Sequence, residues 1–216
     1  MTLPGNLKGV LFDFDGTLFS LNVDWIQLKH ELATIAELTG TPRRVSETLA
    51  LASPAQKARM IDAIDRAELQ GVITGHPING AADVLQMLHV RGIAVAIVSR
   101  NGRPAIEAGC RAGGIALPNV IIARDDVDRH KPDPEGLLLA LNRLGVEPGA
   151  AVMVGDSVHD VDAAHAIGVP AILFRNPEIP RQPLTKAELV VDDYAQLAEA
   201  LLPQTTGSGL DRERVG

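Results

Sequence analysis

Cysteine and aromatic residues are scarce in this sequence of 216 residues. A single cysteine, Cys110, cannot form an internal disulfide, which excludes the class of small disulfide-stapled domains. Aromatic residues make up only 3% of the chain, so aliphatic side chains must fill the core. The hydrophobic share of 46% is nevertheless ordinary for a folded domain. The length suits one large domain, or one domain with a modest insertion.

Long apolar runs and an excess of positive charge are also lacking. The longest apolar runs, such as residues 93–98, are far shorter than the roughly 20 residues of a membrane-spanning helix. Lysine and arginine number 20 against 27 acidic residues, a net charge of −7, which disfavours broad attraction to nucleic acid or anionic lipid. The first eight residues lack the basic and apolar pattern of a secretory signal. We therefore expect a cytoplasmic protein with neither nucleic acid nor a membrane as partner, and no pattern indicates an oligomeric state.

Short apolar runs alternate with segments of helical spacing. The runs are typical of buried strands and lie at residues 8–13, 93–98, 120–123, 151–154, 171–174 and 189–191. A capping side chain stands before a proline at three expected helix starts, Thr41–Pro42, Ser53–Pro54 and Asp133–Pro134. The alternation predicts an α/β fold with a doubly wound, Rossmann-like parallel sheet. In such a sheet the binding crevice lies at the carboxyl ends of the strands.

One long segment, residues 19–78, breaks the alternation. It contains no convincing strand and has helical patterns at residues 25–38, 42–51 and 54–69. We interpret it as a small all-helical cap domain inserted after the first strand, and we favour a lid over the crevice rather than an extra packing layer.

This interpretation divides the chain into two domains and a tail. The core domain would consist of residues 1–18 and 79–202, and the cap of residues 19–78. Residues 203–216 have little to bury and are expected to form a disordered tail.

Two carboxylates, those of Asp13 and Asp15, follow the first expected strand two residues apart. The period of a strand aims both side chains to the same side. Because close like charges raise each other's pKa, such a pair normally requires a cation or a shared proton. Ligands that offer only oxygen favour a hard cation, with Mg²⁺ the first choice. In isolation the pair fits an ordinary turn equally well.

Three further expected strand ends carry polar side chains. Asp156 and Asp160 would share one face of a starting helix and could complete a cation site. Ser99 precedes another expected helix, where a hydroxyl and free backbone N–H groups bind anions. Lys131 lies between two prolines that restrict its backbone, which indicates a fixed charge for phosphate or for the carboxylates. Each group alone fits a helix cap or a solvated side chain, but their meeting at one sheet edge predicts a functional site.

With these four motifs the sequence resembles the haloacid dehalogenase (HAD) superfamily of aspartate-nucleophile phosphatases, in particular members similar to phosphoglycolate phosphatase. Residues 13–18 resemble the first family motif, Ser99 the second, residues 131–134 the third and residues 155–160 the fourth. The resemblance extends from about residue 8 to residue 201. The family also places a small helical cap between the first two motifs, where the helical segment lies.

The resemblance implies a role for each carboxylate of the first motif. Asp13 would attack phosphorus and become an aspartyl-phosphate. Asp15 would protonate the leaving alcohol and then activate water, for which it needs a raised pKa. A phosphate dianion repels a carboxylate, so Mg²⁺ and Lys131 would have to offset that charge before the attack.

The resemblance also implies the metal ligands. Mg²⁺, the one cofactor expected, would take oxygens from the Asp13 side chain, the Asp15 main-chain carbonyl and the Asp156 side chain. Asp160 would support the site from a second layer.

Ser99 and Lys131 would hold the phosphoryl oxygens, again by resemblance. Many relatives have asparagine directly after the serine or threonine of the second motif, whereas here Arg100 intervenes and Asn101 follows. Asn101 is retained as a candidate phosphate contact. Arg100 either forms a salt bridge outward, which is the simpler interpretation, or adds charge to the substrate pocket.

The expected function is Mg²⁺-dependent hydrolysis of a small-molecule phosphate monoester through an aspartyl-phosphate. A phosphomutase acting on a sugar phosphate uses the same scaffold and stays open as an alternative. A non-enzymatic phospho-receiver domain is more remote, because the downstream strand ends in Ser99 and the helical insertion is foreign to that design. Carbon–halogen hydrolysis is disfavoured, since Asp15 and a metal site suit a phosphate ester.

Overall fold

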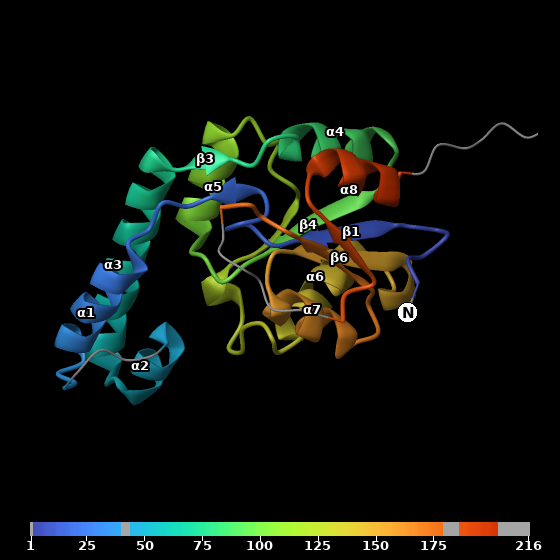
Figure 1. Cartoon of the computed structure of the whole chain (residues 1–216). Helices are drawn as coiled ribbons and strands as arrows, with labels where there is room; N and C mark the ends of the chain where they lie inside the picture. The colour runs from blue at the N-terminus through green and yellow to red at the C-terminus, as the bar shows by residue number, and fades with distance from the viewer. Residues whose placement is uncertain (1, 40–43, 179–185, 203–216) are drawn as a thin grey trace, which may run out of the picture.

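A six-stranded parallel sheet forms the centre of the molecule (Figure 1). The computed structural model describes residues 2–39, 44–178 and 186–202. The strand order is β5-β4-β1-β6-β7-β8, and every neighbouring pair is parallel. The strands are β1 (Gly9–Phe12), β4 (Ala94–Val98), β5 (Val120–Ile122), β6 (Ala151–Gly155), β7 (Ala171–Phe174) and β8 (Leu189–Val191). All six lie at the expected apolar runs, so the expected parallel α/β sheet is confirmed.

Helices cover both faces of this sheet, which makes it doubly wound. One face carries α4 (Ala81–Val90), α5 (Arg103–Ala112) and α8 (Tyr194–Leu201), and the other carries α6 (Glu135–Leu144) and α7 (Val158–His165). Side chains alternate along each strand: Val10 and Phe12 pack with the first layer and Leu11 with the second. Burial on both faces explains why the strands appear in the sequence as continuous apolar runs.

Helix starts follow the expected capping signals with one displacement. Ser53 caps α3 (Pro54–Thr74), and its hydroxyl accepts the N–H of Gln56. Helix α6 begins at Glu135, one residue later than Asp133–Pro134 indicates, because Pro134 holds the capping position. Asp133 still accepts the N–H of Glu135 at 3.0 Å. The expected start at Thr41–Pro42 and the expected tail at residues 203–216 lie outside the described residues.

Three of the helices between β1 and β4 form a small helical cap, drawn at the left of Figure 1. They are α1 (Trp25–Ile35), α2 (Val45–Leu51) and α3. The cap has its own apolar cluster, made by Leu28, Leu32, Ile35, Ala52, Met60, Ala63 and Ile64. All three helices fall within residues 19–78, the segment expected to form the cap. Among the helices that the structure describes, none is long and apolar enough to span a lipid bilayer.

Two short strands that the sequence analysis missed join the cap to the core. β2 (Phe19–Ser20) and β3 (His76–Pro77) pair antiparallel, and both bind Glu178: the Ser20 hydroxyl donates to it at 2.7 Å, and His76 Nε2 lies 2.8 Å from it. A side chain at Gly75 would place its Cβ 2.2 Å from the Ser20 carbonyl oxygen, so the approach requires glycine. Strands of two residues show no period in a sequence, which is why they were not predicted.

Candidate active site

The first motif forms a rigid turn at the carboxyl end of β1. The Asp13 N–H donates to the Val154 carbonyl of β6 at 2.9 Å, and Asp13 Oδ1 accepts the Phe14 N–H at 2.7 Å. Phe14 is fully buried and stacks on Phe19, with ring centroids 5.9 Å apart. Backbone and ring contacts therefore hold the Asp13 carboxylate in one place before any substrate arrives.

Lys131, from the loop between β5 and α6, reaches this carboxylate. Its Nζ lies 2.9 Å from Asp13 Oδ1 and 2.5 Å from Asp160 Oδ1, and it also donates to the Val98 carbonyl at 2.8 Å. Burial lowers the pKa of Lys131, but the carboxylates of Asp13 and Asp160 raise it more, so the ammonium group stays charged. The fixed charge expected at Lys131 thus sits between two acids.

The fourth motif follows β6 and opens α7. Asp156 lies before the helix rather than on it, contrary to the expectation of a shared helical face, because Ser157 is the N-cap of α7. Asp160 completes a capping box: its Oδ2 accepts the Ser157 N–H at 3.0 Å and the Ser157 hydroxyl at 2.6 Å. A Cβ at Gly155 would lie 2.3 Å from Asp160 Cγ, so glycine is needed for this close approach.

Asp13, Asp156 and Asp160 form a buried acidic cluster in which one carboxylate oxygen from each lies within 4.8 Å of the others. Burial, with the charges of Asp13 and Asp160 adding to its effect, raises the pKa of Asp156 to about 8. Burial also raises the pKa of Asp13, while Lys131 opposes this. Three buried carboxylates facing one ammonium group leave uncompensated negative charge, which is costly. An all-oxygen donor set of this kind fits a hard divalent cation such as Mg²⁺.

The hydrogen bonds of the cluster distinguish its members. Asp160 uses both carboxylate oxygens, Oδ1 with Lys131 and Oδ2 with Ser157. Asp13 uses Oδ1 for both the Phe14 N–H and Lys131. Asp13 can therefore offer its second oxygen to a cation, whereas Asp160 orients its neighbours.

Asp15 lies beside the cluster, and its carboxylate is not one of the three. Its Oδ1 accepts the N–H of Leu21 at 2.9 Å. The pKa of Asp15 is raised to about 7, mainly by burial, which the Leu21 N–H opposes and the charges of Asp13 and Glu68 reinforce. A carboxyl with this pKa can give and take a proton at neutral pH.

Ser99 stands at the carboxyl end of β4, directly after the carbonyl that binds Lys131. Its N–H donates to Ile122 of β5 at 2.9 Å, which fixes its backbone. Its hydroxyl donates to Asn101 Oδ1 at 2.8 Å, and the Asn101 N–H returns to the hydroxyl oxygen at 3.3 Å. Both residues are buried. The side chain of Asn101 therefore faces Ser99 and the cap.

Arg100 is exposed and forms no ion pair or hydrogen bond with any residue that the structure describes, so the outward salt bridge is absent there. It lines a small pocket together with Ser99, His130 and Lys131. Burial lowers the pKa of His130 and of His159, and the charge of Arg100 lowers both further. This favours the second interpretation, in which Arg100 adds charge beside the site.

Sequence reasoning missed two buried charged residues next to this edge, Glu68 of α3 and Arg124 after β5. Arg124 Nη1 lies 3.2 Å from Glu68 Oε1. One signal was present: Glu68 stands in line with the buried residues Met60, Ile64 and Val72 at a spacing of four. A carboxylate on such an apolar stripe must find a partner.

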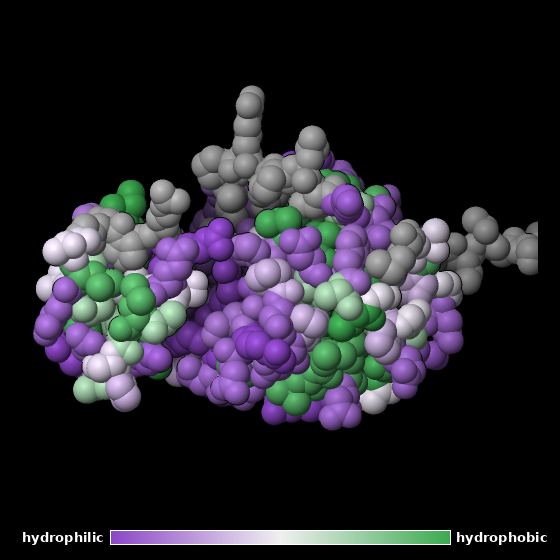
Figure 2. Space-filling view, turned by 90° about the horizontal axis from the view of Figure 1, so that it is seen from below, coloured by the Kyte–Doolittle hydropathy of each residue, from purple (hydrophilic) through white to green (hydrophobic). Residues whose placement is uncertain are grey.

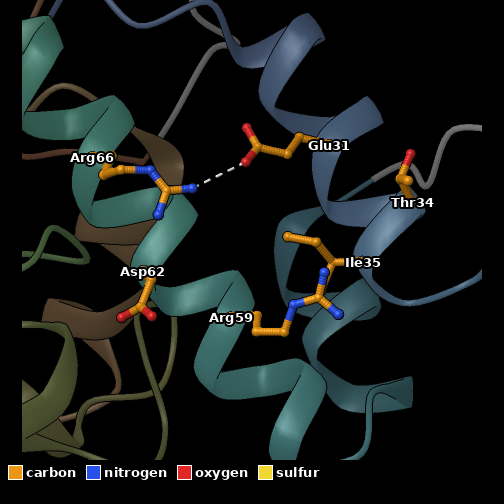
Figure 3. Close-up of a pocket in the computed structure, with 6 residues that line it drawn as sticks. All are labelled: Glu31, Thr34, Ile35, Arg59, Asp62 and Arg66. Atoms are coloured by element: carbon orange, nitrogen blue, oxygen red, sulfur yellow. Dashed lines mark hydrogen bonds and ion pairs between the residues drawn. The ribbon is translucent and has the colours of Figure 1, made fainter.

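The surface where the cap meets the core is predominantly hydrophilic in the view of Figure 2. A separate pocket lies within the cap, between α1 and α3, and is lined by Glu31, Thr34, Ile35, Arg59, Asp62 and Arg66 (Figure 3). None of the residues of the acidic cluster lines this pocket, so the pocket is separate from the candidate active site.

This fold and this edge of acids around one lysine are those of a capped α/β hydrolase. The chain belongs to the haloacid dehalogenase-like hydrolases, whose family model matches residues 7–168. An N-acetylmuramic acid 6-phosphate phosphatase of Pseudomonas aeruginosa is 27% identical over 90% of this chain and 95% of its own length. A phosphoglycolate phosphatase of Salmonella typhimurium is 30% identical over 77% of this chain and 81% of its own length.

The fold is shared with a solved structure of CbbY from Rhodobacter sphaeroides in complex with xylulose-(1,5)bisphosphate. The TM-score is 0.66 at 24% identity, and the match covers 88% of this chain and 96% of that one. The protein is thus an enzyme of the HAD hydrolase family, as the resemblance implied, and the receiver-domain alternative is wrong.

Proposed function

We propose that this enzyme is a Mg²⁺-dependent phosphatase that hydrolyses a small-molecule phosphate monoester through an aspartyl-phosphate on Asp13. The observation that carries the proposal is the contact of 2.9 Å between Lys131 and a buried Asp13 within an acidic cluster. The names of the two curated relatives, both phosphatases of small phosphate esters, agree with it.

In the first step the Asp13 carboxylate forms a bond to phosphorus as the bond to the ester oxygen breaks. Lys131 and Ser99 hold the phosphoryl oxygens, and the Lys131 charge reduces the repulsion between carboxylate and phosphate. Asp15 gives its proton to the departing alcohol oxygen. A pKa near 7 makes the protonated form of Asp15 available for this transfer.

In the second step Asp15, now a carboxylate, takes a proton from a water molecule. The water oxygen bonds to phosphorus and the bond to Asp13 Oδ breaks, which releases inorganic phosphate. Asp13 is again a carboxylate and Asp15 is again protonated, so the cycle closes.

Asp13, the Asp15 carbonyl and Asp156 would hold Mg²⁺, with Asp160 orienting them. When bound there, Mg²⁺ supplies positive charge that stabilises the phosphoryl oxygens. The oxygen-only donors and the uncompensated negative charge of the cluster support this assignment.

We also propose how the chain divides into a cap and a catalytic core, and where in the cell the enzyme works. Residues 19–78 would form the cap that shields the site from bulk water, and residues 1–18 and 79–202 would form the catalytic core. The substrate would be the enzyme's partner in the cytoplasm, without nucleic acid or membrane. A buried, unpaired Cys110 suits that reducing compartment.

A panel of phosphate monoesters, assayed with and without EDTA, tests the proposal. We expect phosphate release that EDTA abolishes, and none from Asp13→Asn. Turnover in H₂¹⁸O should place the label in the released phosphate and not in Asp13, because water attacks phosphorus and the bond between phosphorus and Asp13 Oδ breaks. Label in the Asp13 carboxylate would contradict this second step. Rapidly quenched enzyme should carry a phosphoryl group on the peptide that contains Asp13, and its absence during turnover would contradict the aspartyl-phosphate. Dependence on a sugar bisphosphate without net phosphate release would indicate the phosphomutase instead.

A further inference from the structure

A carboxylate of the cap, that of Glu68, is buried against the core with 2% of its surface exposed. Its Oε2 accepts the N–H of Gly102 at 2.8 Å. Its Oε1 accepts the side-chain amide of Asn101 at 3.1 Å and lies 3.2 Å from Arg124 Nη1. A cap residue is thus bound to both residues that follow Ser99 and Arg100 in the second motif.

The backbone at this contact is shaped to admit the cap. Gly102 is the N-cap of α5, and a Cβ there would lie 2.6 Å from Asp65 Oδ1 and 2.8 Å from Arg124 Nη2. A side chain at this position would push the cap carboxylates away. The Gly102 N–H, one of the free donors expected to bind an anion at this helix start, instead binds the protein's own carboxylate.

The Asn101 amide links Glu68 to Ser99. Because the Glu68 carboxylate can only accept hydrogen bonds, the donor end of the Asn101 amide, Nδ2, must face the cap. Oδ1 then faces the core and accepts the Ser99 hydroxyl at 2.8 Å. Two hydrogen bonds in series therefore connect the cap helix α3 to the hydroxyl at the end of β4.

Charge balance explains why this linkage is firm. Burial raises the pKa of Glu68, while Arg124 and the donors of Gly102 and Asn101 oppose this. Arg124 is itself buried and also pairs with Asp65, which lies on α3 with Glu68. Removing Glu68 would leave the Gly102 N–H and the Asn101 amide without their acceptor in a buried place.

We propose that Glu68 is a positioning residue that anchors the loop of residues 99–102 to the cap and thereby fixes the position of Ser99, whose hydroxyl proton turns from Asn101 Oδ1 to a phosphoryl oxygen when phosphate binds. The inference rests on the proposed function for the assignment of Ser99 to the phosphoryl group. It predicts that the cap contributes to phosphate affinity without touching phosphate.

The test uses the full chain and inorganic phosphate as the probe, measured as a competitive inhibitor of chromogenic ester hydrolysis. Glu68→Ala should weaken phosphate binding about tenfold or more, because a charge-assisted anchor is lost. Glu68→Gln should lie between Ala and the original residue, because it keeps an acceptor for Gly102 but lacks the second carboxylate oxygen. The KM for the chromogenic ester should also rise, less in Glu68→Gln than in Glu68→Ala.

Glu31→Gln is the matched control. It makes the same chemical change on the cap, where Glu31 pairs with Arg66 across the α1–α3 pocket at 3.2 Å (Figure 3). Phosphate inhibition should be unchanged in this variant. If Glu68→Ala lowers only the melting temperature or the active fraction, and phosphate inhibition stays the same, the inference is wrong.

A measurement on the unaltered protein covers the case in which the Glu68 variants do not fold. The side-chain amide signal of Asn101 in an NMR spectrum, assigned by its loss in Asn101→Ala, should be protected from solvent exchange and should shift when phosphate is added. Fast exchange, or no response to bound phosphate, would overturn the inference. Absence of ester hydrolysis by the unaltered enzyme would instead count against the proposed function, and the NMR experiment would still test the anchor.

Discussion

The ammonium group of Lys131 lies 2.9 Å from Asp13 Oδ1, and both side chains are almost wholly removed from solvent, at 3% and 10% exposure. The second acid beside this ammonium group, Asp160, is more deeply buried still. Asp13, the proposed nucleophile, is therefore held by a cation that the fold itself supplies. Because the pair lies in a place of low dielectric, loss of one partner leaves the other charge without compensation.

Lys131→Met should therefore destabilise the protein by about 3–5 kcal/mol at neutral pH and abolish turnover, since Asp13 and Asp160 lose their shared cation. Urea unfolding measures the loss of stability. Lys57→Met, at an exposed position of the cap, is the control and should leave both properties nearly unchanged. An equally stable Lys131→Met would show that the pair contributes nothing to the fold.

Asp15→Asn should separate the two steps of the reaction according to the leaving group. An alkyl phosphate needs a proton on its departing oxygen, so its turnover should fall by about 100-fold or more. 4-Nitrophenolate leaves without a proton, so 4-nitrophenyl phosphate should give a rapid burst of product followed by slow turnover. Stopped-flow absorbance measures the burst. Intact turnover of both esters would refute the role of Asp15 as the acid and base.

Stability of the metal-free protein should fall as pH rises. Asp15 and Asp156 have pKa values of about 7 and about 8 in the folded state, well above the ordinary pKa of an aspartate side chain. In that interval the folded state binds more protons than the unfolded state, so the free energy of unfolding decreases between about pH 4 and pH 8. Mg²⁺ offsets the ionised carboxylates. The rise in Tm on adding Mg²⁺ should thus be larger at about pH 8 than at about pH 5.5.

Asp156→Asn is the companion variant for that measurement. It removes one ionising group and one proposed ligand, so both the fall of stability with pH and the response to Mg²⁺ should become smaller. A metal-free protein that gains stability over the same interval would contradict the raised pKa values.

Arg100→Gln should change substrate preference rather than general activity. An ester with an additional carboxylate near the phosphate should show a KM raised by about five- to tenfold, because the Arg100 guanidinium group, which has no ion pair among the described residues, attracts the second anion. An ester of a neutral alcohol should change much less. Arg129→Gln serves as the control, because Arg129 lines the same pocket but is paired with Glu135 at 3.0 Å. Equal effects of Arg100→Gln on both esters would place the charge outside the substrate region.

The sequence predicted those parts of the molecule that depend on local pattern. Most strands of the sheet are buried on both faces, so each appears as a continuous apolar run, and polar residues such as Asp13 and Ser99 mark where a run stops. Parallel strands then bring these ends to one edge. The acidic cluster follows from that topology, as the proximity of the Asp13 and Asp156 carboxylates shows.

Local sequence patterns did not predict features that depend on contacts between residues far apart in the chain. β2 and β3 exist because Phe19 meets Pro77 across the linker, although neither strand has a period of its own. The partners of Glu68 lie 33 to 56 residues further along the chain. A capping box at Ser157 placed Asp156 before the helix, and only the competition between two possible caps decides that position.

The pairing of β2 with β3, which joins the cap to the core, bears on how the substrate selectivity of such enzymes can change. The chain leaves the core and returns to it at neighbouring points, and the helices in between pack on an apolar cluster of their own. A graft that replaces the residues between Ser20 and His76 would therefore preserve the two points where the chain leaves and re-enters the core, although it would remove the contacts of Glu68 with Asn101 and Gly102. Substrate selectivity can then change by exchange of the whole cap, provided that the helix that replaces α3 carries a hydrogen-bond acceptor for Asn101 and Gly102.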